Sequence, residues 1–110
     1  MSMKLHTIPL SPHCRKIMAL IGHLDIPCKL VIYGPGASQN PDLLAVNPNG
    51  KVPALQDGDV HVWESNEILH YLAAKLGSDL WPKDSAQQRE IRQWQFWESA
   101  HYSHAVLAIF

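Results

Sequence analysis

The chain has 110 residues, enough for one small domain, and its content of 46% hydrophobic and 17% charged residues is ordinary for a soluble globular protein. Its net charge of -1 argues against a nucleic-acid or membrane-surface partner. No apolar run approaches the ~20 residues of a membrane span, and the N-terminus lacks a signal peptide's apolar core, so we expect a cytoplasmic protein.

The first part of the chain predicts a βαβ unit. Met3–Ile8 reads as a short strand, and Ser11-Pro12 predicts a helix start, because serine is a good N-cap and proline is tolerated at the first helical position. This helix should run to about Leu24. Cys28–Tyr33 is rich in β-formers and predicts a second strand, parallel to the first. The helix should bury a stripe formed by Cys14, Ile17, Met18, Ile21 and Leu24.

The middle of the chain predicts a short helix, a hairpin and a longer helix. Residues 41–45 form the short helix, and residues 52–55 and 60–63 form two strands joined at Asp57-Gly58. The longer helix opens near Glu64–Glu67 and closes at Gly77. The resulting β-α-β-α-β-β-α order predicts an α/β domain over residues 1–77.

The last part of the chain predicts a linker and one helix. Residues 78–84 form the linker, and Ser85 with Gln88 matches a capping box at the start of a helix over residues 85–110. This helix has no stop signal, since the chain ends in the apolar run 105–110. We therefore expect a truncated chain, ending within the first helix of a second, all-α domain.

Pro53 suggests a place for a peptide ligand. It cannot donate a ladder hydrogen bond, which confines it to a sheet edge or a strand start and exposes the backbone of Val52. Exposed edge amides pair with a peptide backbone, and helix N-termini attract its carboxylates. On these features alone, an ordinary hairpin and helix without a ligand is the simpler interpretation.

Two motifs together suggest a family. The run Ser11–Lys16 (SPHCRK) follows the first strand, and Asn47–Pro53 (NPNGKVP) leads eleven residues later to Glu64-Ser65. This pairing closely resembles the glutathione S-transferase family, whose N-terminal domain has the thioredoxin fold. The resemblance covers essentially the whole chain. It implies a homodimeric enzyme that conjugates the glutathione thiolate to an electrophilic small molecule.

The resemblance also implies a glutathione site. The proline matching Pro53 is cis in the family, and Val52 before it would pair with the cysteinyl backbone of glutathione. Glu64 and Ser65 would hold the γ-glutamyl end, and Lys51 would reach the glycine carboxylate. These polarities suit the ligand, because an ammonium group prefers a carboxylate and a carboxylate prefers amides, hydroxyls or lysine.

Ser11 is the predicted catalytic residue. A free thiol with a pKa near ~8.5 is mostly protonated at neutral pH, and a helix N-terminus with a hydroxyl donor lowers that value. Ser11 stands at the start of the first helix, as the catalytic serine does in theta- and delta-like classes of the family. The alternative is a plain N-cap, and one oxygen cannot fill both roles with equal geometry.

Cys14 carries the competing hypothesis, since some family members use a cysteine at this helix start for thiol-disulfide exchange. The chain would then be a glutathione-dependent reductase or peroxidase. With only Cys14 and Cys28 present, a disulfide scaffold is not expected. A third hypothesis is a non-catalytic module that keeps the fold for protein contacts. Glu98 and His101 form a single E-x-x-H pair, so no metal site is predicted.

Overall fold

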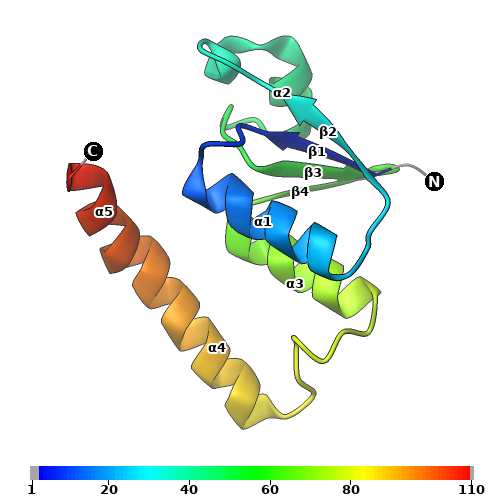
Figure 1. Ribbon diagram of the computed structural model, residues 1–110, viewed down its shortest axis with the longest axis vertical. Helices are drawn as coiled ribbons and strands as arrows, with labels where there is room; N and C mark the ends of the chain where they lie inside the picture. The colour runs from blue at the N-terminus through cyan, green and yellow to red at the C-terminus, as the bar shows by residue number, and fades with distance from the viewer. Residues whose placement is uncertain (1–2, 110) are drawn as a thin grey trace. The chain divides into compact units, whose positions relative to one another are not determined.

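A four-stranded sheet forms the centre of the first part of the chain. The computed structural model describes residues 3–109, which divide into two units, Met1–Leu72 and Ala73–Phe110. The strand order is β2-β1-β3-β4, with β1 parallel to β2 and antiparallel to β3 (Figure 1). The strands are β1 Met3–Thr7, β2 Cys28–Ile32, β3 Ala54–Asp57 and β4 Val60–Trp63.

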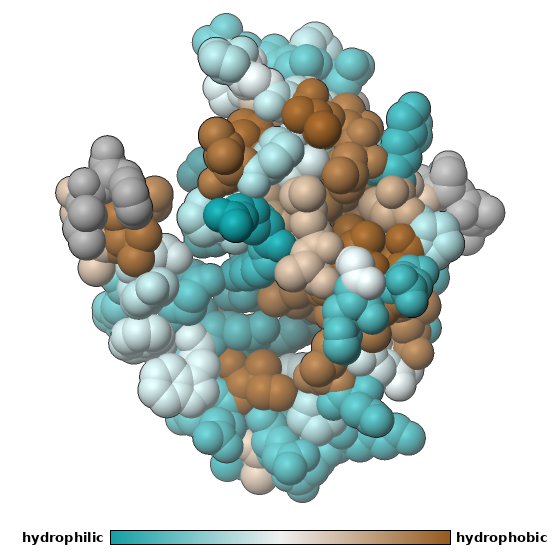
Figure 2. All heavy atoms as spheres, in the orientation of Figure 1, coloured by the Kyte–Doolittle hydropathy of each residue, from teal (hydrophilic) through white to brown (hydrophobic). Residues whose placement is uncertain are grey.

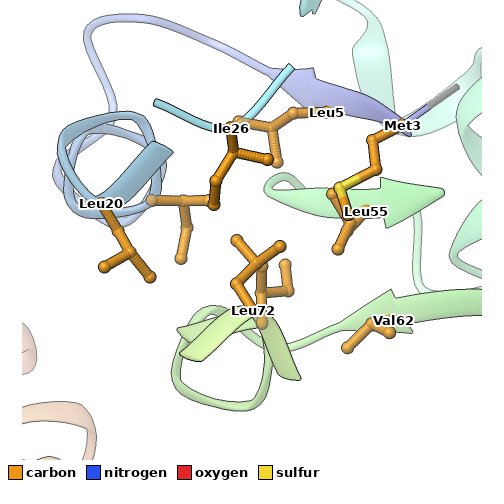
Figure 3. Close-up of a cluster of buried hydrophobic side chains, with 9 residues drawn as sticks. Met3, Leu5, Leu20, Ile26, Leu55, Val62 and Leu72 are labelled. Carbon is orange, nitrogen blue, oxygen red and sulfur yellow. The ribbon is translucent and has the colours of Figure 1, made fainter. Parts of the chain in front are cut away.

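Helices α1 (Pro12–His23) and α3 (Ser65–Lys75) cover one face of this sheet (Figure 1). Because strand side chains alternate between faces, every second residue of β1 points toward these helices. Figure 3 shows the resulting core between the sheet and the helices. Its buried residues are Met3, Leu5, Ile17, Leu20, Ile26, Leu55, Val62, Ile68 and Leu72.

The short helix α2 (Pro41–Val46) packs through a separate, smaller cluster. Asn40 caps it, since the Asn40 side chain accepts a hydrogen bond of 2.9 Å from the Asp42 amide. The cluster consists of buried Leu43, Val46 and Ala54, with Tyr33, Ala37 and Val52 packed against them. With these helices, the predicted β-α-β-α-β-β-α order is confirmed. A 3-10 turn, η1 (Ala37–Gln39), was not predicted, because three residues carry no periodicity.

The hairpin lies slightly later in the chain than predicted. The strand expected over residues 52–55 is β3, which begins at Ala54, so the turn is formed by Gly58 and Asp59. Pro53 has no N–H for the ladder, which explains why pairing starts after it. The strand is also internal, since β3 pairs with both β1 and β4. The expectation of a sheet edge at Pro53 was therefore wrong, whereas its position before the first paired residue agrees with the strand-start alternative.

Strand β2, one of the two edge strands of the sheet, exposes apolar side chains. Leu30 is 37% and Ile32 is 63% exposed, and Figure 2 shows hydrophobic side chains gathered over this strand.

In the predicted α1 stripe, Cys14 and Ile17 are buried, while Met18, Ile21 and Leu24 are only half-buried. Leu20, outside that stripe, is buried because it lies three residues after Ile17 on the same helix face.

His6 is a buried polar residue of β1 on the α2 side of the sheet. It is 4% exposed, and its Nδ1 lies 2.7 Å from the hydroxyl oxygen of Tyr33, with the two rings stacked at 5.7 Å. Burial lowers the pKa of His6 below its ordinary value of 6.5. Lys4 and His61 lower the pKa further, whereas hydrogen bonding to Gln56 and the charge of Asp42 oppose the shift. The ring is therefore neutral at neutral pH.

We expect this histidine to make stability depend on pH. Between the lowered pKa and 6.5, the unfolded chain binds more protons at His6 than the folded chain does, so stability falls as pH drops through that window. His6→Phe keeps a ring of similar size and removes this proton. Urea unfolding at about pH 7.5 and about pH 5.5 should show that the free energy of unfolding falls more between these pH values for the wild type than for His6→Phe. Equal falls in the two proteins would contradict a lowered pKa at His6.

The second unit contains a helix with an irregular centre. In place of one helix over residues 85–110, α4 (Ser85–Trp97) continues through a π-helical segment (Glu98–Tyr102) into α5 (Ser103–Ile109), and Phe110 lies outside the described residues. The Ser103 hydroxyl donates to Glu98 Oε2 at 2.8 Å across this segment. Trp94, Phe96, Trp97, Tyr102 and Leu107 are exposed along it. Among residues 3–109, no helix is long and apolar enough to cross a membrane.

The start of α4 differs from the predicted capping box. The N-cap is Asp84, whose side chain accepts from the Gln87 amide at 3.0 Å. Gln88 donates its side-chain amide to the Pro82 carbonyl at 2.7 Å instead of reaching back to the cap. A carboxylate one residue earlier competes with Ser85 for the same amides. The division into residues 1–77, 78–84 and 85–110 stays a prediction. The boundary between the two compact units falls between Leu72 and Ala73, inside the sequence of α3.

Candidate active site

Three segments of the first unit leave the sheet at the same end. In the strand register, His6 of β1 lies opposite Ala54 of β3, and Ala54 lies opposite Trp63 of β4. The chain after β1, the chain before β3 and the chain after β4 therefore meet there. These segments, with the helices that two of them enter, carry all the predicted site residues: Ser11, Cys14, Lys51, Val52, Pro53, Glu64 and Ser65.

Ser11 occupies the N-cap position of α1 but does not cap it with its side chain. Its backbone is extended, with φ -71° and ψ 127°, and its carbonyl accepts from the Arg15 amide at 2.9 Å. Its amide donates to the Ile8 carbonyl at 2.9 Å, which closes the turn between β1 and the helix. The Ser11 hydroxyl makes no capping hydrogen bond. The half-buried side chain is thus left available for another acceptor or donor.

Cys14 faces the interior from the first turn of α1. Its exposed fraction is 0%, and the Ile8 amide donates to its sulfur at 3.5 Å. A thiol in this position helps fix the turn that precedes the helix. Attack on a disulfide requires access to the sulfur, which this burial withholds.

The loop before Pro53 is held by a residue that sequence reasoning did not assign. Asn47 is 3% exposed, and its side-chain amide donates to the Lys51 carbonyl at 2.9 Å. Its Oδ1 accepts from the Asn49 amide at 3.0 Å, and the Asn47 carbonyl accepts from the Gly50 amide at 2.9 Å. The Asn-Pro-Asn-Gly run is typical of this turn chemistry, although it was considered above only as part of a family motif.

The Val52-Pro53 peptide bond is cis, as the family resemblance implies. Val52 lies just outside the sheet and has no backbone hydrogen bond to the described part of the chain, while its side chain packs against the α2 cluster. An extended peptide can therefore pair with Val52 at the beginning of β3. Lys51, directly before it, is exposed.

Glu64 has a strained backbone at the start of α3. Its φ is 75°, a left-handed conformation that costs a non-glycine residue about 1–3 kcal/mol. Its carbonyl accepts the Ile68 amide at 3.0 Å, so Glu64 directly precedes the first helical residue, Ser65. Such outliers concentrate at ligand clamps, and this one turns the chain between β4 and α3.

The N-termini of α1 and α3 lie at the same end of the helix pair (Figure 1). Lys16 Nζ of α1 donates to Asn66 Oδ1 of α3 at 2.9 Å, a contact that the sequence alone did not suggest. Two helix N-termini and a lysine make this end favourable for anions, and Glu64 adds a carboxylate for a cation. The arrangement suits a small ligand that carries both charges.

The predicted site needs no metal ligands. Within the described part of the chain, no group of three or more His, Cys, Asp or Glu side chains could hold a metal ion. Glu98 and His101 both lie in the π-helical segment of the second unit.

Comparison with models of known protein families shows to which family this chain is related. Residues 5–79 match the family model described as the glutathione S-transferase N-terminal domain. The chain belongs to the glutathione S-transferase family. The matched range includes β1 from its third residue onward, the other three strands, α1, α2, α3 and every candidate site residue from Ser11 to Ser65.

Individual glutathione S-transferases agree with this match. The chain is 36% identical over 86% of its length to GstB of Escherichia coli, covering 48% of that protein, and 37% identical over 91% of its length to glutathione S-transferase 3 of Zea mays, covering 47%. The crystal structure of a theta class glutathione S-transferase from Xanthomonas axonopodis pv. citri, with glutathione bound, has a TM-score of 0.86 and 28% identity. That comparison covers 94% of this chain and 51% of the other.

The chain thus spans about half the length of the curated glutathione S-transferases it matches. Its fold is the thioredoxin-like arrangement of the family's N-terminal domain, followed by helices of the second unit.

Proposed function

We propose that the protein is a glutathione S-transferase that binds glutathione at the sheet end described above and transfers its thiolate to an electrophilic small molecule. One observation carries this proposal: the Ser11 hydroxyl stands at the N-terminus of α1 without capping it. It lies at the sheet end that also bears the cis Val52-Pro53 bond and the strained turn at Glu64.

Glutathione would bind as a short extended peptide. Its cysteinyl backbone would pair with Val52, which has no backbone partner in the described chain. Its γ-glutamyl ammonium group would meet the Glu64 carboxylate, and its γ-glutamyl carboxylate would meet Ser65 at the N-terminus of α3. Lys51, exposed beside this segment, would pair with the glycine carboxylate.

Catalysis would consist of stabilising the thiolate. Each unit by which the site lowers the thiol pKa corresponds to about 1.4 kcal/mol of preference for the charged sulfur. The Ser11 hydroxyl would donate to the sulfur, and the dipole of α1, twelve residues long, would add a favourable potential. The thiol proton would pass to solvent, and the sulfur electron pair would form a carbon–sulfur bond to the electrophile. The leaving group would depart with the electrons of its broken bond; where the electrophile is an activated double bond, its π electrons would instead take up a proton from water.

The structure favours serine over cysteine as the catalytic residue. Ser11 is half-buried with an unused hydroxyl, whereas Cys14 is 0% exposed and already accepts the Ile8 amide. Formation of a mixed disulfide at Cys14 with oxidised glutathione, detected by mass spectrometry, would instead support the reductase. A homodimer and a cytoplasmic location belong to the proposal as properties implied by the family.

Isothermal titration calorimetry tests the proposal at its first step. We expect glutathione to bind with a dissociation constant in the micromolar to millimolar range typical of enzyme substrates. S-methylglutathione, whose sulfur cannot form a thiolate, should bind through the same backbone and carboxylate contacts. Cys-Gly, which lacks the γ-glutamyl group, should bind much more weakly. Absence of glutathione binding, or equal affinity for Cys-Gly, would overturn the proposed site.

A further inference from the structure

Buried His6 and half-buried Tyr33 together link the centre of the sheet to the α2 segment. His6 lies in β1, directly opposite Ala54 of β3, and Nδ1 of His6 is 2.7 Å from the Tyr33 hydroxyl. Tyr33 follows β2, where its amide donates to the Thr7 carbonyl at 3.0 Å and continues the ladder. Tyr33 is therefore held at its backbone amide by Thr7 and at its hydroxyl by His6.

Tyr33 in turn packs against the cluster that seats α2. Leu43 and Val46 of that helix are 0% and 5% exposed, and both belong to this cluster. Val52 packs into the same cluster from the loop before β3. Tyr33 and Val52, whose backbone would pair with glutathione, thus pack against the same buried cluster that seats α2.

We propose that His6 is a positioning residue for glutathione, acting through its hydrogen bond to Tyr33 on the packing of α2 and Val52. This inference rests on the proposed function for its ligand. The loop between α2 and β3 is anchored at one side by the Asn47 hydrogen bonds and at the other by the packing of Val52. Loss of the hydroxyl that fixes Tyr33 would leave the second anchor free to shift.

Tyr33→Phe tests this inference with the loss of one oxygen atom. The variant should bind glutathione about three- to tenfold more weakly, because one part-buried hydrogen bond orients the ring. The kcat at saturating glutathione should stay within about twofold, since Ser11 is unaffected. Hydrogen exchange of residues 41–53 should become faster in the variant without ligand.

Tyr71→Phe is the matched control. The Tyr71 hydroxyl donates to the buried carboxylate of Asp57 at 2.5 Å, and Asp57 lies at the other end of β3. This variant loses the same atom and a bond to a carboxylate that is at least as strong, so it should lose at least as much stability as Tyr33→Phe while keeping wild-type glutathione affinity. If both variants weakened binding equally, general destabilisation would explain the effect and the inference would be wrong.

A double-mutant cycle separates positioning through the pair from independent effects. His6→Phe should weaken glutathione binding to the same extent as Tyr33→Phe, and the double variant should bind no more weakly than either one. Additive losses would overturn the coupling. If the wild type binds no glutathione, the proposed function fails, and hydrogen exchange then decides the inference: unchanged exchange of residues 41–53 in Tyr33→Phe refutes it.

Discussion

Replacing Ser11 with alanine should lower kcat/KM for conjugation by roughly 10- to 100-fold, equivalent to about 1.4–2.7 kcal/mol of transition-state stabilisation. The hydroxyl does not cap α1, so its removal should cost little stability. Without this donor, the pKa of the bound thiol should rise and the pH profile of kcat/KM should shift to higher pH. Steady-state kinetics with a chromogenic electrophile across pH measures both effects.

Two controls test whether Ser11 acts through its hydroxyl on the thiol and not through glutathione binding. Glutathione affinity of Ser11→Ala, measured by calorimetry, should stay within about twofold of the wild type, because Val52, Glu64 and Ser65 would make the peptide contacts. Ser11→Thr retains a hydroxyl and should keep most of the activity. An unchanged pH profile in Ser11→Ala would remove Ser11 from the proposed role.

Gly50→Ala should destabilise the protein by about 3 kcal/mol or more and abolish measurable glutathione binding. Gly50 has φ 66°, and a Cβ there would lie 2.6 Å from the backbone carbonyl oxygen of Ser38. Neither backbone can move without disturbing the loop that carries Lys51 and Val52. Urea unfolding and calorimetry measure the two losses.

Gly36→Ala separates this clash from backbone strain. Gly36 also has a positive φ, 85°, but a Cβ there meets nothing within 4 Å. It should therefore cost only about 1–2 kcal/mol and leave glutathione affinity unchanged. A loss as large as that of Gly50→Ala would show that contact with Ser38 is unimportant.

Local signals were sufficient to predict most of the fold. Ser11-Pro12 marked the start of α1, and the apolar spacing of α1 predicted two of its three buried residues, Cys14 and Ile17. These signals depend on residues near one another in sequence. The capping of α4 was misassigned because Asp84 and Ser85 are adjacent and both are good caps, so only the three-dimensional hydrogen bonds distinguish them.

The candidate site also contains features that the sequence predicted and others that only the structure shows. The roles of Ser11 and Glu64 were predicted only because two motifs together resemble a family, whereas Pro53 by itself suggested a peptide partner for Val52. Cis X-Pro bonds are too rare, at about 5–6%, to predict from one sequence. The His6-Tyr33 bond and the Lys16-Asn66 bond join residues 27 and 50 positions apart. No periodicity or cap signal reports such contacts, since they depend on strand register and helix packing.

The register that gathers the loops of the candidate site at one sheet end leaves the opposite end free of them. Asp57 pairs with Met3 and with Val60 there, and the two-residue connection at Gly58-Asp59 follows directly. This connection is the natural point at which to lengthen the polypeptide, because exposed hairpin tips accept insertions. A fluorophore or affinity tag introduced at Asp59 would thus be attached at the end of the sheet opposite the candidate site.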